Sequence, residues 1–150
     1  MKSIFNEADN IEILNRISLL TSSSTPVWGK MNVSQMLAHC SEGLKMATGE
    51  LTPKRVPFPI SILGKLLKNT ALGNTDFRKN SPTAAELTIA NSKDFAKEKE
   101  RLSAAVKSLY ALGEQGIQEE IHPFFGKLTQ KEWGILNYKH LDHHLRQFGG

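Results

Sequence analysis

Three of the five histidines lie close together near the end of the chain, in the stretch YKHLDHHLRQFGG. In a helix, successive residues are rotated by about 100°, so His144 lies about 40° from His140, while His143 lies about 60° away in the opposite direction. The apolar residues of this stretch centre on the side of His140 and His144. Two imidazoles one turn apart can share one metal ion. His140 and His144 are therefore candidate metal ligands, and His143 is predicted to be a surface residue.

A third ligand has to come from another segment, because protein zinc sites use three or four side chains. His39 lies in the second predicted helix, at the edge of its apolar face. His122 precedes Pro123 in a predicted loop, where the sequence fits a ligand and a loop anchor equally well. H-x-x-x-H spacing is common by chance. Spacing alone therefore leaves two interpretations of His140 and His144 open, metal ligation and ordinary burial in a core.

Four long segments have the apolar spacing and the end signals of helices. They span about residues 9–20, 31–50, 92–116 and 130–148. Asp9 or Asn10 is the expected N-cap of the first helix, and Asn32 that of the second. Thr129 and Glu132 form a capping box at the start of the last helix. These segments have to position the histidines.

The apolar residues of the first three helices are expected to face a common core. They are Ile11, Leu14, Ile17 and Leu20 in the first, Val33, Met36, Leu37, Cys40, Leu44 and Ala47 in the second, and Phe95, Leu102, Val106, Leu109 and Tyr110 in the third. No segment shows the alternation of a strand, and IHPFFGK is predicted to be a loop. The sequence therefore predicts an all-α fold, a four-helix bundle in a single domain over residues 1–150.

A long crossover separates the second and third helices. It begins with LTPKRVPFPI, whose three prolines exclude a regular helix. The segment SILGKLLKN is expected to form a short helix. Between residues 51 and 80 a single acid, Asp76, stands against six basic residues, namely Lys54, Arg55, Lys65, Lys68, Arg78 and Lys79. Such charges usually form a solvated face, but they could also receive an acidic ligand.

Composition excludes several classes of protein. The 150 residues are 39% hydrophobic with a net charge of +4, which indicates a folded domain. No dense basic run with interleaved aromatics favours a nucleic-acid binder, and no apolar run reaches the roughly 18 residues of a membrane helix. The single cysteine, Cys40, and a start without a signal-peptide pattern predict a cytoplasmic protein. Cys40 is expected to be buried and inert.

The segments MNVSQMLAHC and HPFFGKLTQKEWGILNYKHLDHHLRQFG resemble the DinB-like superfamily of metalloproteins, and most closely a branch of unknown function. The resemblance implies an up-down-down-up bundle with a long crossover between helices 2 and 3. It also implies a divalent ion, zinc or nickel, held by three histidines. Matched to the motifs, these are His39, His140 and His144. The sequence departs where RQ replaces the RGQ of many relatives, which leaves the ligands unchanged.

The resemblance also implies an activity. Better known branches transfer or isomerise groups with a low-molecular-weight thiol, so we expect a metal-dependent transferase acting on a small electrophile, with hydrolysis by activated water as another chemistry. The alternative is a non-catalytic metal- or ligand-binding bundle or a dimeric interaction module. Tyr138 and Asn137 are candidate partners of the imidazoles, and Arg146 and Lys139 candidate contacts for an acidic ligand. Relatives often pair, so a homodimer is expected.

Overall fold

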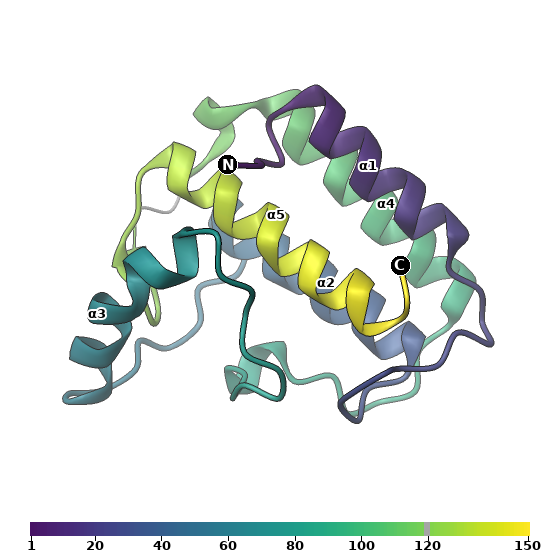
Figure 1. The fold of residues 1–150 in the computed structure, drawn as a ribbon, viewed down its shortest axis with the longest axis horizontal. Coiled ribbons are helices and arrows are strands. Elements are labelled where there is room, and N and C mark those ends of the chain that lie inside the picture. The colour runs from purple at the N-terminus through teal and green to yellow at the C-terminus, as the bar shows by residue number, and fades with distance from the viewer. Residues whose placement is uncertain (119–120) are drawn as a thin grey trace.

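The computed structural model describes residues 1–118 and 121–150, and its regular structure is mostly helical (Figure 1). The α-helices are α1 (Glu7–Leu19), α2 (Val33–Thr48), α3 (Ile60–Leu72), α4 (Phe95–Leu112) and α5 (Gln130–Gln147). There are also two short 3-10 helices, η1 (Ala85–Leu87) and η2 (Glu114–Gly116), and two strands, β1 (Ile121–His122) and β2 (Gly126–Lys127). The prediction of a helical fold is confirmed.

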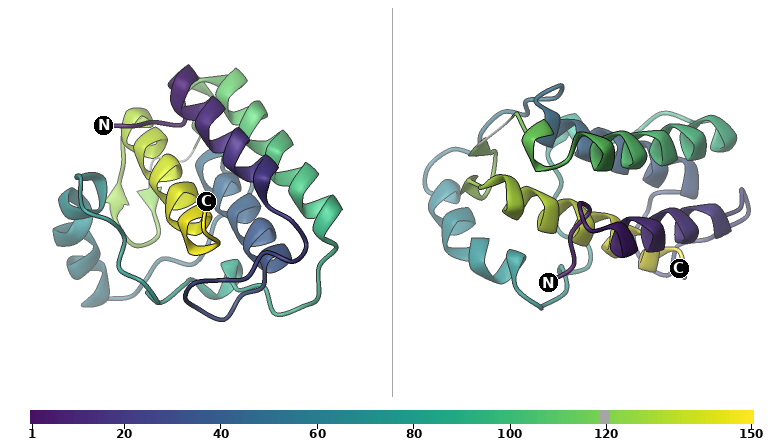
Figure 2. Two further views of the ribbon diagram at one scale, coloured as in Figure 1. Left: turned by 45° about the vertical axis from the view of Figure 1, so that its right-hand side comes forward. Right: turned by 90° about the horizontal axis from the view of Figure 1, so that it is seen from above.

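Four of the helices enclose the core. α2 packs against α4 and α5, and α1 packs against the same two helices. In Figures 1 and 2, α1 lies beside α4 and α5 lies beside α2, with α1 and α5 running opposite to α2 and α4. The largest fully buried side chains come from all four helices and both ends of the chain; they include Ile4, Ile13, Ile17, Met36, Leu37, Leu102, Val106, Trp133, Leu141 and Leu145.

Two of the three predicted N-cap residues are the ones that the structure shows. Asn32 and Thr129 cap α2 and α5 in complete capping boxes, as predicted. The predicted cap of the first helix is wrong, because Asn6 caps α1 by accepting the amide of Asp9 at 3.2 Å. Asn10 is buried instead, and its side-chain amide donates to the carbonyl of Ile4.

The predicted inward faces are confirmed for α2 and are wrong at single positions elsewhere. Ile11 is 50% exposed, whereas Ile13, two residues on, is fully buried. Two residues correspond to about 200° of rotation, so burial of Ile13 directs Ile11 outward. Tyr110 is 37% exposed because the neighbouring Leu109 points into the core at the last turn of α4.

The crossover holds α3 at the outside of the four-helix core, against α5 and β2 (Figure 2). The predicted short helix is confirmed and is longer than expected. Gly64 fixes its position, because a Cβ there would lie 1.9 Å from the carbonyl oxygen of Phe124. Only glycine permits so close an approach of the helix to the hairpin.

The segment IHPFFGK is not a simple loop as predicted. It forms a hairpin in which Ile121 pairs with Lys127 and His122 pairs with Gly126. Each strand has two residues, which is too short to produce the alternation by which strands are recognised in a sequence. Gly126 ends the turn at a φ of 76°, a left-handed conformation that favours glycine.

Among the described residues, none of the helices combines the length and the apolar character needed to cross a lipid bilayer.

Candidate metal centre

His39 is positioned by α2, a helix buried along most of its length. Its start is fixed by reciprocal bonds, in which the Gln35 amide donates to the Asn32 side chain and the Asn32 amide to the Gln35 side chain. His39 is only 3% exposed, so its predicted place at the edge of the apolar face is wrong. The helical wheel considered only the helix's own apolar residues, whereas α4 and α5 cover α2 on two sides and widen its buried face.

His140 and His144 are positioned by α5. The Glu132 amide donates to Thr129 Oγ1 at 3.2 Å, which fixes the start of the helix. Trp133 and Leu141 anchor the helix in the core, with exposures of 1% and 0%. His144 is buried and His140 is half-buried on the side that faces α2. The face predicted from the 100° rotation is therefore the face that meets His39.

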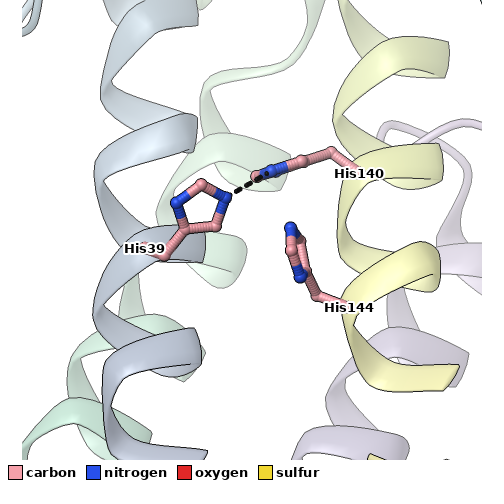
Figure 3. Close-up of side chains that lie close together, drawn as sticks. All are labelled: His39, His140 and His144. Carbon is pink, nitrogen blue, oxygen red and sulfur yellow. Dashed lines mark hydrogen bonds between the residues drawn. The ribbon is translucent and has the colours of Figure 1, made fainter. Parts of the chain in front are cut away.

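The three imidazoles converge on one point between α2 and α5 (Figure 3). The Nε2 atoms of His39 and His140 are 3.0 Å apart, and one ring nitrogen from each of the three residues lies within 4.8 Å of the others. Two nitrogens bound to one zinc ion at about 2.1 Å are separated by about 3.0–3.4 Å, depending on the angle. The pair His39 and His140 already lies within that range, and the group of three within 4.8 Å.

Hydrogen bonds orient two of the three rings. His39 Nδ1 lies 2.9 Å from the carbonyl oxygen of Leu87, and His144 Nδ1 lies 2.8 Å from Gln147 Oε1. Both partners are acceptors, so each Nδ1 holds the proton and each Nε2 presents a lone pair. Gln147 is held in turn, because its Nε2 donates to the carbonyl of Trp28 at 2.7 Å. Metal-binding histidines are oriented by such acceptors.

The environment keeps the three rings neutral. Burial lowers the pKa of His39, and the hydrogen bond to Leu87 only partly opposes this. Burial, together with repulsion by His39, lowers the pKa of His144 to about 3. Burial and the charges of the neighbouring histidines hold the pKa of His140 well below its usual 6.5. Neutral imidazole is the form that binds metal ions.

A glycine on α2 makes room for His140. A Cβ at Gly43 would lie 2.8 Å from Cε1 and 3.1 Å from Nδ1 of the His140 ring. Gly43 follows His39 by one turn. The helix α2 therefore provides one ligand candidate, His39, and also the space beside it for a second, His140. Glycine within a helix costs about 1 kcal/mol relative to alanine, which this close approach explains.

One known protein family matches almost the whole chain. Residues 5–149 match the model of a family described as a protein of unknown function, DUF1569. The chain belongs to this family. The matched region includes His39, His140 and His144, so the whole candidate centre lies within the DUF1569 domain. No curated protein and no solved structure gives a significant match.

The other two histidines of this DUF1569 domain lie outside the centre. His143 contacts the rings of Trp28 and Phe77, at centroid distances of 5.5 and 6.0 Å. It is half-buried and lies apart from the group that His39, His140 and His144 form. His122 anchors the hairpin, because its Nδ1 accepts the amides of Phe124 and Phe125. Of its two predicted roles, the loop anchor is the one observed.

Three neighbouring residues have roles other than chemistry at the centre. Cys40 is buried against Met36, and burial raises the pKa of its thiol, as expected for an inert cysteine. The predicted contact of Tyr138 with an imidazole is wrong, since its hydroxyl donates to Glu12. Asn137 is buried on the centre's side of α5, but its Nδ2 has no hydrogen-bond partner within the described structure.

The predicted basic contacts on α5 are occupied within the protein. Lys139 Nζ donates to the carbonyl oxygens of Gly73 and Thr75, at 2.6 and 2.9 Å. Arg146 pairs with Asp76 through two bonds and also with Asp142. Both side chains therefore hold the end of the crossover against α5. Asp142 also bonds Arg16 of α1 at 2.7 Å.

Sequence reasoning missed Gln147, the Leu87 carbonyl and Gly43. Gln147 follows His144 by three residues, a spacing that places both on one side of a helix, so this partner could have been found. The contact of Leu87 with His39 depends on the path of the crossover, and that of Gly43 with His140 on the spacing of two helices. Neither leaves a local signal in the sequence.

Proposed function

We propose that His39, His140 and His144 hold a divalent metal ion, zinc or nickel. The observation that supports this most directly is the convergence of three neutral imidazoles, two of which have Nδ1 bonded to fixed acceptors. Nε2 of His39 and Nε2 of His140 lie 3.0 Å apart in a hydrogen bond (the dashed line in Figure 3), and a cation in place of the shared proton would bind both atoms.

We further propose that the fold is a four-helix bundle of the DinB-like kind. α1, α2, α4 and α5 would be its helices, in up-down-down-up order, with the long crossover between α2 and α4. The opposite directions of the paired helices in Figure 1 and their mutual packing support this. So do the motifs around His39 and His140, which resemble those of the superfamily.

The activity that we propose is transfer of a small thiol to an electrophile. A cation held by three neutral nitrogens has open coordination positions and favours the thiolate form of a thiol near neutral pH. Within the described residues, no fourth histidine, cysteine or carboxylate joins the group of three, which fits an open position. The reducing cytoplasm in which we place the protein would supply the thiol.

The protein's own part in this chemistry is to hold the rings and exclude water. Nδ1 of His39 keeps its proton and donates to the Leu87 carbonyl, and Nδ1 of His144 donates to Gln147 Oε1, so both rings keep one orientation. His39 and His144 are only 3% and 9% exposed, so the packed core keeps most water away from these two rings.

Metal content and thiol binding test this proposal. Protein purified without a nickel column should contain about one zinc or nickel ion per chain by elemental analysis. When cobalt replaces that ion, a small thiol should produce a sulfur-to-metal charge-transfer band that saturates with thiol concentration. The band should be absent in His140→Ala. A cobalt spectrum unchanged by millimolar thiol would contradict transfer and favour hydrolysis or a non-catalytic metal site.

We also propose that the protein is a homodimer that pairs through α3. Six large apolar side chains are at least 40% exposed on this helix and the turn before it, namely Phe58, Ile60, Ile62, Leu63, Leu66 and Leu67. A contiguous apolar surface of this kind is typical of an interface. Phe58 and Ile60 are the first two of these side chains along the chain, and Val56, just before them, is half-buried.

Sedimentation tests the dimer. At high micromolar concentration the protein should sediment as a dimer, and Leu66→Glu should shift it to a monomer, because the charge would be buried in the interface. Leu112→Glu, at a 50% exposed leucine at the end of α4, is the matched control and should remain dimeric. A monomeric parent protein at that concentration would contradict the proposal.

A further inference from the structure

A groove lies between the first part of the crossover and the hairpin. It consists of two hollows of about 280 and 440 Å³ that share Arg55, Ile121 and Pro123. The first, the Trp133 hollow, is also bounded by Met46, Leu51 and Trp133. The second, the Lys65 hollow, is bounded by Lys65 and by His122 of the hairpin, among others. The groove is distinct from the three-histidine centre, since none of the three lines it.

Two of the three cations that line the groove have no acidic partner among the described residues. Arg55 and Lys65 are exposed, and neither makes an ion pair or a side-chain hydrogen bond within the described residues. The described residues that line the two hollows include no aspartate or glutamate. An unpaired guanidinium beside a concave apolar wall is suited to a planar carboxylate, which it can bind through two parallel hydrogen bonds.

Trp133, one of the residues that line the groove, has a hydrogen-bond donor without an acceptor among the described residues. Trp133 is 1% exposed, and its Nε1 has no partner in the part of the chain that the structure describes. Because His122 Nδ1 accepts two amides, the proton of the neutral ring is on Nε2, which is therefore also a donor. Buried donors without acceptors are costly, and an acceptor brought by a ligand would remove that cost.

The size and walls of the Trp133 hollow define the rest of the ligand. Its volume is about 280 Å³, roughly twice the 150 Å³ of an engineered cavity that binds benzene. Met46, Leu51 and Pro53 provide apolar walls. We propose that this hollow binds a small organic acid, with a bicyclic or similar apolar body against these walls and its carboxylate between Arg55 and the indole of Trp133.

This site would be adjacent to the proposed metal centre. Trp133 and His140 lie on the same side of α5, seven residues or about 10 Å apart along the helix axis. Asn137, between them, supplies another donor without a partner within the described structure. The acid binds through groups that do not touch the three histidines. The site can therefore be tested on protein without metal, and its failure would leave the metal proposal intact.

Nuclear magnetic resonance of the indole groups tests the site directly. The chain has two tryptophans, so its spectrum contains two indole N–H signals, and Trp133→Phe identifies that of Trp133. The probe is 2-naphthoate, with 2-naphthalenemethanol as the neutral analogue of the same shape. The acid should shift the Trp133 signal saturably and leave that of Trp28 unchanged. The alcohol should bind at least about tenfold more weakly, since it lacks the charge-assisted bond.

Two variants sharpen the test without removing the tryptophan. Arg55→Gln should weaken 2-naphthoate about tenfold and have little effect on the alcohol. Arg78→Gln, at another exposed arginine of the crossover, is the matched control and should bind as the parent does. Absence of a saturable shift, or equal binding of acid and alcohol, would overturn the proposal. An equal shift with inorganic phosphate would also overturn it, because the apolar walls would then contribute nothing.

Discussion

Two histidines of this protein, the buried His144 and the half-buried His122, illustrate how the same residue type serves opposite purposes in two regions. In the centre between α2 and α5, Nδ1 of His144 donates to Gln147, and its Nε2 lone pair faces two other imidazoles. In the hairpin, Nδ1 of His122 accepts two backbone amides. Burial lowers the pKa of both, to about 3 and about 4.

The difference lies in what occupies the lone pair. An acceptor beside Nδ1 leaves the lone pair of Nε2 available for a metal ion, whereas donors beside Nδ1 use the available lone pair to hold the chain. Neutrality and burial are common to both residues and so do not identify a ligand. The hydrogen bonds of Nδ1 distinguish a candidate ligand from a structural histidine. Three experiments can test this distinction.

The largest effect should come from removing a ligand candidate. His39→Ala and His144→Ala should each weaken metal binding by more than about 100-fold, beyond the 10–100-fold typical of losing an outer hydrogen-bond partner. His143→Ala and His122→Asn should keep stoichiometric metal. Elemental analysis after dialysis measures this. Loss of metal in His143→Ala, with retention in His144→Ala, would show that the wrong histidine was assigned.

A smaller effect should come from Gln147→Leu. This change removes the acceptor of His144 Nδ1 and puts an apolar side chain of similar size in its place. Without Gln147 Oε1 the His144 ring can rotate or change tautomer, so metal affinity should fall by about 10–100-fold. Competition with a chelator measures the affinity. Lys131→Gln, at an exposed position of the same helix, is the control. Unchanged affinity in Gln147→Leu would mean that the bond does not orient the ligand.

The smallest effect concerns stability and pH in the hairpin. Burial lowers the pKa of His122 from 6.5 to about 4. Between these values the unfolded chain binds a proton that the folded chain does not, so acidification favours unfolding, by at most about 3 kcal/mol from this residue. In His122→Asn the amide oxygen can accept the same backbone amides but does not titrate.

Urea unfolding of metal-free protein between pH 7 and pH 4 measures this contribution. The free energy of unfolding of His122→Asn should fall less steeply with acidification than that of the parent protein. The three histidines of the centre also have lowered pKa values and contribute to the slope in both proteins. An unchanged slope in the variant would show that His122 does not stay neutral in the fold.

Much of the scaffold was predictable from local patterns. Asn32 and the pair of Thr129 and Glu132 mark the starts of α2 and α5 in the sequence, and the structure confirms both. The apolar spacing of α2 correctly predicted its core face. The 100° rotation separated His144 from His143 before any neighbour was known. These features depend only on residues within a turn or two of one another.

The sequence by itself determined the four long helices, the capping residues of α2 and α5 and the side of α5 that bears His140 and His144. Only the tertiary structure decided that His39 is fully buried, that the Leu87 carbonyl fixes its ring and that Gly43 makes room for His140. It also revealed that the crossover and hairpin enclose a groove beside Trp133. The physical reason is how far apart along the chain the interacting residues lie. Helix formation and capping depend on neighbours along the chain, whereas burial and ring orientation depend on which distant segments the packed core brings together.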